Sequence, residues 1–320
     1  MKKLASGRLT TIIIIALTYI VIKALMTGNI IDATREITLM TIGINIMLAV
    51  SLNLVTGYTG QFSLGHAGFM AIGAYTCAII NLEMRSLIGF LLGICLAAVF
   101  AASVGILIGV PTLRLKGDYL AIATLGLAEI IRIMLLNLQI TNGAAGLNGI
   151  PKFVNFEWMF FFAVATILCI NNFIHSSHGR ACISVREDEV AAESMGINIT
   201  KQKIIAFAMG AFFAGIAGAV HASYFHFISP GQFGFLKSID ILVIVVLGGM
   251  GSTSGSIIAA ILLAVMNAYL RAFPEIRMIL YSLMLVTIMI FRPQGIMGSK
   301  ELSLDKMVRR IGRKPETKIS

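Results

Sequence analysis

The sequence predicts an all-α polytopic membrane protein with about ten transmembrane helices. Its 320 residues are 58% hydrophobic and only 12% charged, whereas soluble domains are about 45–50% apolar. Apolar stretches of about 20 residues, the length that crosses a bilayer, recur along the chain. They are continuous rather than alternating, which excludes a β-barrel and favours helices that satisfy their own backbone hydrogen bonds.

Seven stretches are long enough to be interpreted as spans directly: Leu9–Met26, Ile37–Thr56, Leu87–Val110, Tyr119–Ile140, Trp158–Ile174, Ile204–Phe227 and Ile276–Phe291. Three shorter or glycine-interrupted stretches complete the predicted set: Phe62–Asn81, Leu236–Met250 and Gly255–Leu270. The first span follows Lys2, Lys3 and Arg8, as in a signal peptide. Because no small-residue cleavage site follows it, we interpret it as an uncleaved helix.

The distribution of basic residues predicts the orientation of the chain. Most of the 25 Lys and Arg residues fall on segments that the ten spans place on one side, and the positive-inside rule makes that side cytoplasmic. Both termini are then cytoplasmic. Five spans before and five after the polar segment 141–157 would give two inverted halves, as in many transporters. We divide the chain into one transmembrane permease domain, residues 1–298, and a basic cytoplasmic tail, residues 299–320.

Residues 176–203 (SSHGRACISVREDEVAAESMGINITKQK) form the most strongly charged segment between the spans. A charge at the bilayer centre costs roughly 2.5–3.5 kcal/mol, so this segment lies in water, on the cytoplasmic side. Residues 187–193 are expected to form a short helix that Gly196 ends. The plain alternative is a solvated connector without a partner. We predict contact with a soluble partner through these residues: Arg180, Arg186, Glu187, Asp188, Glu189, Ala191, Ala192, Glu193 and Gly196.

A sparse polar series leads into a glycine-rich segment. Non-helical backbone at membrane depth is tolerated only where protein or a water-filled cavity covers it. The series therefore lines a translocation pathway or packs helices together, and the sequence leaves both open. The candidate pathway residues are Asn45, Asn53, Gly57, Gly60, Gln61, Ser63 and His66. A second glycine-rich segment, residues 248–255, is interpreted as tight packing.

Few residues in the spans suit catalysis or proton transfer. Glu129 and Arg132 lie three apart in one span, where they can pair on one helix face. A structural pair is favoured over a proton-coupling carboxylate, because an arginine partner would hold Glu129 ionised. No P-loop, G-x-S-x-G or H-E-x-x-H motif occurs. His175 and His178 lack a third ligand, so no metal site is predicted, and the four cysteines show no disulfide spacing.

Several stretches carry a resemblance to a known family. Three stretches resemble the LivM-type permeases of branched-chain amino-acid ABC transporters: GYTGQFSLGHAGFMAIGAYT at 57–76, PTLRLKGDYLAIATLGLAEIIRIMLLN at 111–137, and GRACISVREDEVAAESMGINITKQKIIAFAMGAFFAGIAGAVHA at 179–222. GGMGSTSGSIIAA at 248–260 and FRPQGI at 291–296 extend the likeness over nearly the whole chain. Ala191, Ala192 and Gly196 match part of the coupling-helix motif of such permeases, although Val190 replaces its leading Glu.

The resemblance implies a permease subunit in a bacterial-type inner membrane that forms a heterodimer with a second, related permease. It implies two ATP-binding cassette subunits at the cytoplasmic face, which would bind ATP and magnesium so that this chain needs no cofactor. An extracytoplasmic binding protein would deliver leucine, isoleucine or valine, and transport would proceed by alternating access. No nucleic-acid partner is expected. Two alternatives stay open: a permease for urea or short amides, and ion-coupled secondary transport that uses Glu129.

Overall fold

The computed structural model describes residues 2–28, 32–113, 115, 117–270, 273 and 295–298, with isolated residues between 279 and 291. The chain divides into two compact units, residues 1–37 with 300–320, and residues 38–299. The first unit contains α1 (Lys2–Thr27) and the beginning of α2 (Ala33–Asn53). The predicted basic tail lies outside the described residues, as does most of the predicted span Ile276–Phe291.

The second unit is built mainly from helices. The interior of α2 runs into a π-helical turn, η1 (Leu54–Tyr58), and a non-helical stretch then leads to α3 (His66–Met84). Ser86, Asn198 and Ser252 cap helix N-termini by accepting backbone N–H groups. The other long helices are α4 (Leu87–Thr112), α5 (Asp118–Asn137), α6 (Phe156–Ile174), α9 (Ile199–Phe225), α10 (Phe235–Gly248) and α11 (Thr253–Tyr269).

Seven helical segments of the described chain are long and apolar enough to cross a membrane: Ala33–Tyr58, His66–Met84, Leu87–Thr112, Asp118–Asn137, Phe156–Ile174, Ile199–Phe225 and Pro230–Gly248. The apolar part of α1 (Ile15–Thr27) and α11 are shorter. The predicted helical, multi-pass character is therefore confirmed. The count of ten spans and the cytoplasmic position of both termini stay predictions.

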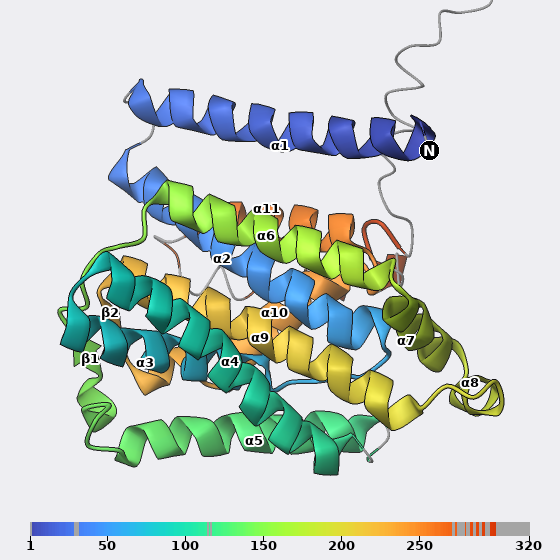
Figure 1. Ribbon diagram of the computed structural model, residues 1–320. Helices are drawn as coiled ribbons and strands as arrows, with labels where there is room; N and C mark the ends of the chain where they lie inside the picture. Colours follow the sequence, from blue (N-terminus) through green and yellow to red (C-terminus); the bar gives the residue numbers. More distant parts are fainter. Residues whose placement is uncertain are drawn as a thin grey trace, which may run out of the picture. The chain divides into compact units, whose positions relative to one another are not determined.

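The core of the second unit lies where α3, α4 and α9 pack together (Figure 1). Small residues let these helices approach closely, which drives helix association in lipid, where apolar burial alone gives little. A Cβ atom on Gly73 of α3 would overlap the Gly215 carbonyl of α9. Gly215 in turn lies against Ala97 and Ala101 of α4. The small-residue pattern of α9 is therefore used for packing against two helices.

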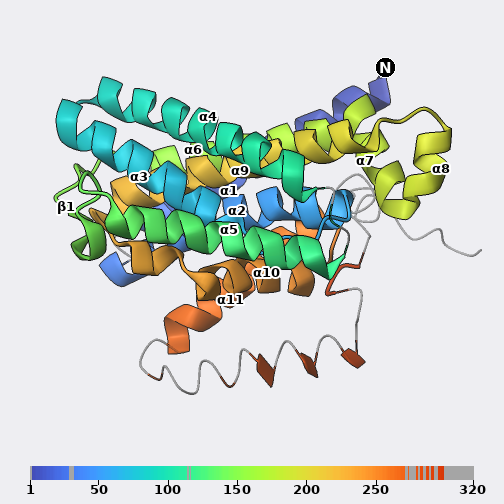
Figure 2. The same ribbon diagram turned by 90° about the horizontal axis from the view of Figure 1, so that it is seen from below.

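Two polar ends of this unit differ in structure (Figures 1 and 2). Helices α7 (Ser177–Glu187) and α8 (Glu189–Ser194) lie at one end. At the other end β1 (Leu147–Asn148) pairs antiparallel with β2 (Phe227–Ile228). Short 3-10 turns, η2 (Gly143–Ala145) and η3 (Pro230–Phe233), flank the strands.

The strand pair corrects the all-α prediction in this detail. Each strand has only two residues, too few to produce an alternating pattern in the sequence. The pairing follows from His226, which leaves α9 with a positive φ of 61° and turns the chain back toward the segment 141–157. Its Nδ1 donates a hydrogen bond to the Ile150 carbonyl at 2.8 Å.

Candidate functional site

The charged segment 176–203 folds as two helices joined at Asp188. The short helix expected over 187–193 is present as α8 but begins two residues later, because Asp188 adopts an extended conformation that ends α7. Its carboxylate then accepts hydrogen bonds from the N–H groups of Val190 (2.9 Å) and Ala191 (3.0 Å), which starts α8. Gly196 ends α8 as expected: its φ is +83°, and Ile197 N–H donates to the Ala192 carbonyl.

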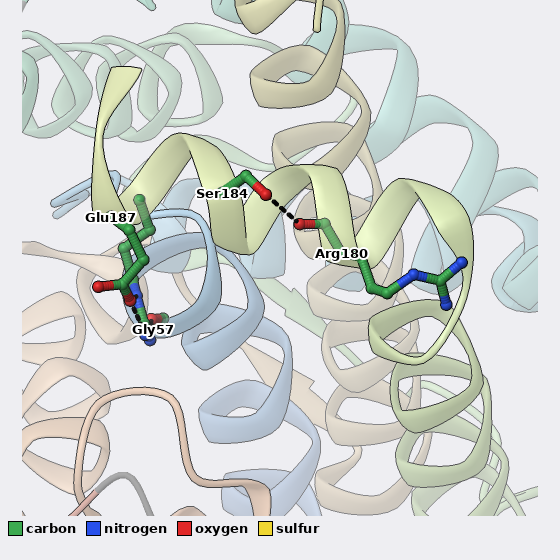
Figure 3. A network of polar contacts seen from close by, with 5 residues as sticks. Gly57, Arg180, Ser184 and Glu187 are labelled. Atoms are coloured by element: carbon green, nitrogen blue, oxygen red, sulfur yellow. Dashed lines mark hydrogen bonds and ion pairs between the residues drawn. The ribbon is translucent and has the colours of Figure 1, made fainter. Parts of the chain in front are cut away.

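Arg186 attaches α7 to the first glycine-rich segment. Its Nη1 donates to the Gly57 carbonyl at 2.8 Å, and its Nε donates to the Glu187 carboxylate at 3.1 Å. Figure 3 shows Glu187 and Gly57 close together at one end of α7, with Arg180 near the other end. There the Arg180 guanidinium donates to the His175 carbonyl at 2.8 Å. Arg186 therefore contacts η1, whereas Arg180 contacts the residue that ends α6.

Both glycine-rich segments meet at Arg186. Gly57 adjoins the carboxamide of Asn53, whose Oδ1 accepts the Gly251 N–H at 2.8 Å. Gly251 has a φ of +86°, and a Cβ there would lie 2.7 Å from the Arg186 guanidinium. A Cβ on Gly60 would lie 3.0 Å from the Arg186 side chain. The glycines thus make room for the Arg186 side chain beside both segments.

Two further contacts hold the charged segment to the bundle. Cys182 is buried, and its thiol donates to the Gln202 carbonyl at 3.8 Å. Burial raises the pKa of the Cys182 thiol to about 11, although a hydrogen bond with Thr59 opposes the shift. Glu189 forms an ion pair with Lys203, a residue that is only 8% exposed. The segment is therefore fixed to α9 and to the stretch after η1.

The outer surface of α8 is partly apolar. Val190 is 74% exposed and Met195 is 83% exposed, although both lie on a charged segment. Ala191 and Glu193 are also exposed, whereas Ala192 is buried and packs inward. Ala192 therefore faces the bundle, and its contact with a partner stays a prediction. Sequence analysis did not single out Val190 and Met195, although exposed apolar residues in a polar segment are a readable signal.

The candidate pathway residues do not form one continuous lining. His66 Nε2 and Ser51 Oγ are 2.7 Å apart in a buried hydrogen bond. Ser63 Oγ accepts the Gly65 N–H at 3.3 Å. Both polar atoms of the Gln61 side chain are buried and have no hydrogen-bond partner within the described chain. Gln61, Ser63 and His66 lie in or beside the non-helical stretch between η1 and α3, whereas Asn45 lies within α2.

Asn45 lines a cavity of about 220 Å³ between α2, α10 and α11. Lys237 Nζ lies 3.5 Å from its Oδ1. Asp240 and Asn267 line the same cavity. Sequence analysis did not single out Lys237 and Asp240, because they stand at the edge of an apolar run, where charges commonly mark a span end. The structure instead includes both in the candidate span Pro230–Gly248.

Glu129 and Arg132 lie beside this cavity. Arg132 Nε donates to Glu129 Oε2 at 2.7 Å, and Phe235 N–H donates to Glu129 Oε1 at 3.2 Å. Both residues line a second cavity, of about 540 Å³, which shares Lys237 and Asp240 with the first. Four ionisable side chains from α5 and α10 therefore line the second cavity, and two of them, Lys237 and Asp240, also line the first.

Metal and disulfide sites are not found in the described part of the chain. No group of three His, Cys, Asp or Glu residues there could hold a metal ion. His178 Nδ1 instead interacts with Gln202 Oε1 at 3.3 Å, and His175 Nδ1 donates to the Asn171 carbonyl at 2.8 Å. The four cysteines, all within the described ranges, are free.

Comparison with known proteins gives a consistent result. The model of a family described as "Branched-chain amino acid transport system / permease component" matches residues 34–289. The chain is similar to the high-affinity branched-chain amino acid transport system permease protein LivM of Salmonella typhimurium, with 41% identity over 297 residues, 82% of this chain and 69% of that protein. For LivM of Escherichia coli the identity is 40% over 299 residues, with 82% and 70% covered. The permease protein LivH of Salmonella typhimurium is 25% identical over 80% of this chain and 92% of its own length. No solved structure matches the chain.

Proposed function

The chain belongs to the family of permease components of branched-chain amino acid transport systems, and we propose that it is a membrane-spanning subunit of an ATP-driven importer. It would translocate leucine, isoleucine and valine by alternating access across a bacterial-type inner membrane. The chain carries no P-loop. ATP and magnesium would therefore be bound by two separate ATPase subunits, and an extracytoplasmic binding protein would deliver the substrate.

The Arg186–Gly57 hydrogen bond carries the mechanistic part of this proposal. An exposed polar segment can drive a membrane bundle only if its movement reaches the helices. Here a single side chain joins α7 to the π-helical turn η1 at Gly57 and lies close to Gly251 in the second glycine-rich segment. Irregular backbone of this kind is where transporter helices break and rearrange. A push on the segment 176–203 would therefore be transmitted to the ends of η1, α10 and α11.

The surface of α8 supports contact with the ATPase subunits. Val190 and Met195 place apolar side chains in water beside the charged residues Glu187, Asp188 and Glu193. An apolar centre with a charged rim is the usual composition of a protein–protein contact. A solvated connector, the plain alternative, gives no reason for Val190 and Met195 to be so strongly exposed.

A second permease would complete the pathway. The relatives of this chain include proteins named LivM and proteins named LivH, both described as permeases of branched-chain amino acid transport systems. The higher identity to LivM supports the assignment of this chain to that subunit, with a LivH-like chain as its partner. Large apolar side chains on the outward faces of α4 and α5, such as Leu107 and Ile122, suit either lipid or such a partner.

Proteoliposome uptake tests the proposed function. Vesicles that contain this chain, the second permease, both ATPase subunits and the binding protein should accumulate leucine only with ATP. Omission of the ATPase subunits should abolish uptake. Accumulation by this chain alone, driven by an ion gradient, would refute the proposal.

The two alternatives receive less support. A proton-coupling carboxylate needs to gain and lose a proton, but both oxygens of Glu129 already accept hydrogen bonds, from Arg132 and from Phe235 N–H. Urea or short amides would be recognised by a different binding protein. Competition between leucine and urea for that protein separates the two substrate classes.

A further inference from the structure

Buried polar atoms without partners are concentrated around η1. Gln61 is only 2% exposed, and neither Oε1 nor Nε2 of its side chain has a hydrogen-bond partner in the described chain. Asn53 Nδ2 and Thr56 Oγ1 are also buried there without a partner. Of the seven such atoms in the described chain, these four lie within residues 53–61. Because a buried polar atom without a partner costs free energy, their concentration calls for a ligand or an ordered water.

The chain interrupts its helix at this point. The turn η1 is π-helical, and π-helical turns are frequent at functional sites. The Gln61 N–H donates to the Val55 carbonyl at 3.0 Å, which holds Gln61 beside this turn. Residues 59–65 are non-helical and separate the candidate spans Ala33–Tyr58 and His66–Met84. Helices interrupted in this way form the substrate sites of many transporters.

The non-helical stretch runs inside the bundle along α9. At one end, Thr59 hydrogen-bonds Cys182, whose thiol contacts the Gln202 carbonyl near the start of α9. At the other end, a Cβ on Gly210 of α9 would lie 3.8 Å from the His66 ring. Gly210 follows Gln202 by eight residues, about 12 Å along the helix axis. The stretch therefore extends over about 12 Å, a substantial part of the roughly 30 Å hydrocarbon core of a bilayer.

Arg186 contacts both glycines that precede Gln61. It donates to the Gly57 carbonyl at 2.8 Å. A Cβ on Gly60 would lie 3.0 Å from the Arg186 side chain, and Gly60 has a φ of +74°. Glycine adopts such a conformation readily and can change its backbone dihedrals at little cost. Because Gly60 is bonded directly to Gln61, a displacement of α7 that moves Arg186 would also reorient Gln61 and open the turn.

We propose that Gln61 binds the polar end of an amino acid as the substrate passes through the bundle. Its carboxamide matches a zwitterion, because Nε2 donates to the α-carboxylate and Oε1 accepts from the α-ammonium group. Asn53 Nδ2 adds a donor for the carboxylate, and Thr56 Oγ1 adds an acceptor for the ammonium group. The site is closed in this conformation and opens when α7 moves. The substrate class rests on the proposed function. Because the three side chains are uncharged, the site needs no buried ion and releases its ligand readily.

Transport and stability of the complete complex test the site together. Gln61→Met keeps the length of the side chain and removes both polar atoms. It should lower kcat/KM for leucine uptake about ten- to a hundredfold, since hydrogen bonds to the charged groups of the substrate are lost. Its melting temperature should be unchanged or higher, because the two atoms have no partners in the chain to lose. Gln61→Asn keeps a carboxamide and should retain more activity than Gln61→Met. Gln139→Met makes the same change at an exposed position, and its uptake should equal that of the unmodified complex.

Thiol labelling tests contact with the substrate separately from uptake. Ser63→Cys places a thiol two residues from Gln61, and its reaction with a methanethiosulfonate reagent is measured above that of the four natural cysteines. The reaction should be slow without nucleotide and faster during ATP turnover. Leucine should slow the reaction during turnover, whereas urea should not. This protection should disappear when Gln61→Met is combined with Ser63→Cys.

Four outcomes would contradict the proposals. Normal uptake in Gln61→Met, or labelling that leucine does not slow, would leave water as the occupant of the site and overturn it, with the proposed function intact. A lower melting temperature of Gln61→Met would show that Gln61 has partners within the chain and would also overturn the site. Protection by urea equal to that by leucine would overturn the zwitterionic class. Failure of the unmodified complex to transport any branched-chain amino acid would instead overturn the proposed function.

Discussion

The hydrogen bond between Arg186 and Gly57 makes a quantitative prediction for coupling. Arg186→Ala removes the donor and leaves the buried Gly57 carbonyl without that partner. An unsatisfied buried acceptor costs about 1–3 kcal/mol. Because the Arg186 side chain is 30% exposed, water can replace part of the bond, so we use about 1–1.5 kcal/mol. With 1.4 kcal/mol for each factor of ten, the attached arrangement of α7 is disfavoured about five- to tenfold.

The assay is the number of leucine molecules transported per ATP hydrolysed in proteoliposomes. Arg186→Ala should lower this ratio up to about tenfold, while ATP hydrolysis itself continues. Arg186→Lys should lie in between, because an ammonium keeps the charge but not the planar geometry. Lys201→Ala removes an exposed positive charge from the same segment and serves as the control. An unchanged ratio in Arg186→Ala would show that force does not pass through this contact.

Three further predictions concern packing, reactivity and the α8 surface. Gly73→Ala places a Cβ against the Gly215 carbonyl and should destabilise the protein by about 1–3 kcal/mol in thermal unfolding, whereas Gly126→Ala, with open space around it, should not. The raised pKa of the Cys182 thiol, about 11, leaves little thiolate at pH 7. Maleimide labelling of Cys182 should therefore be slow at pH 7 and should accelerate as the pH approaches 11. Rapid labelling at pH 7 would contradict the burial of this thiol. Met195→Glu should weaken binding of purified ATPase subunits about tenfold without lowering the melting temperature, and unchanged affinity would remove α8 from the interface.

Apolar length and charge were enough to predict most of the architecture from the sequence. The predicted spans Leu87–Val110 and Trp158–Ile174 agree closely with α4 and α6. These helices are long, apolar and bounded by polar residues, so tertiary contacts shift their boundaries little. The segment 176–203 was recognised for the same reason, because its charge density is incompatible with lipid.

The details that failed depend on contacts between distant residues. An aspartate that caps a helix and one that lies inside a helix look alike in sequence. The sequence therefore does not show that Asp188 separates α7 from α8. Ala192 lies on the buried side of α8, and the sequence does not specify which side of so short a helix faces the bundle. Lys237 and Asp240 gain significance only when α2 and α11 complete a cavity around them, and no sequence pattern encodes that arrangement.

Helix α9 has a consequence for communication across the membrane. Near the N-terminus of α9, Gln202 contacts α7 and Lys203 contacts α8. At its C-terminal end the chain continues into β2, which pairs with β1. The helix has 27 residues, about 40 Å of continuous rod. Because both contacts are made by one stiff element, a tilt imposed at α7 and α8 would also displace the loop at the opposite end of α9. Nucleotide binding by partner ATPase subunits would thus have a direct mechanical route to the surface where a receptor would dock.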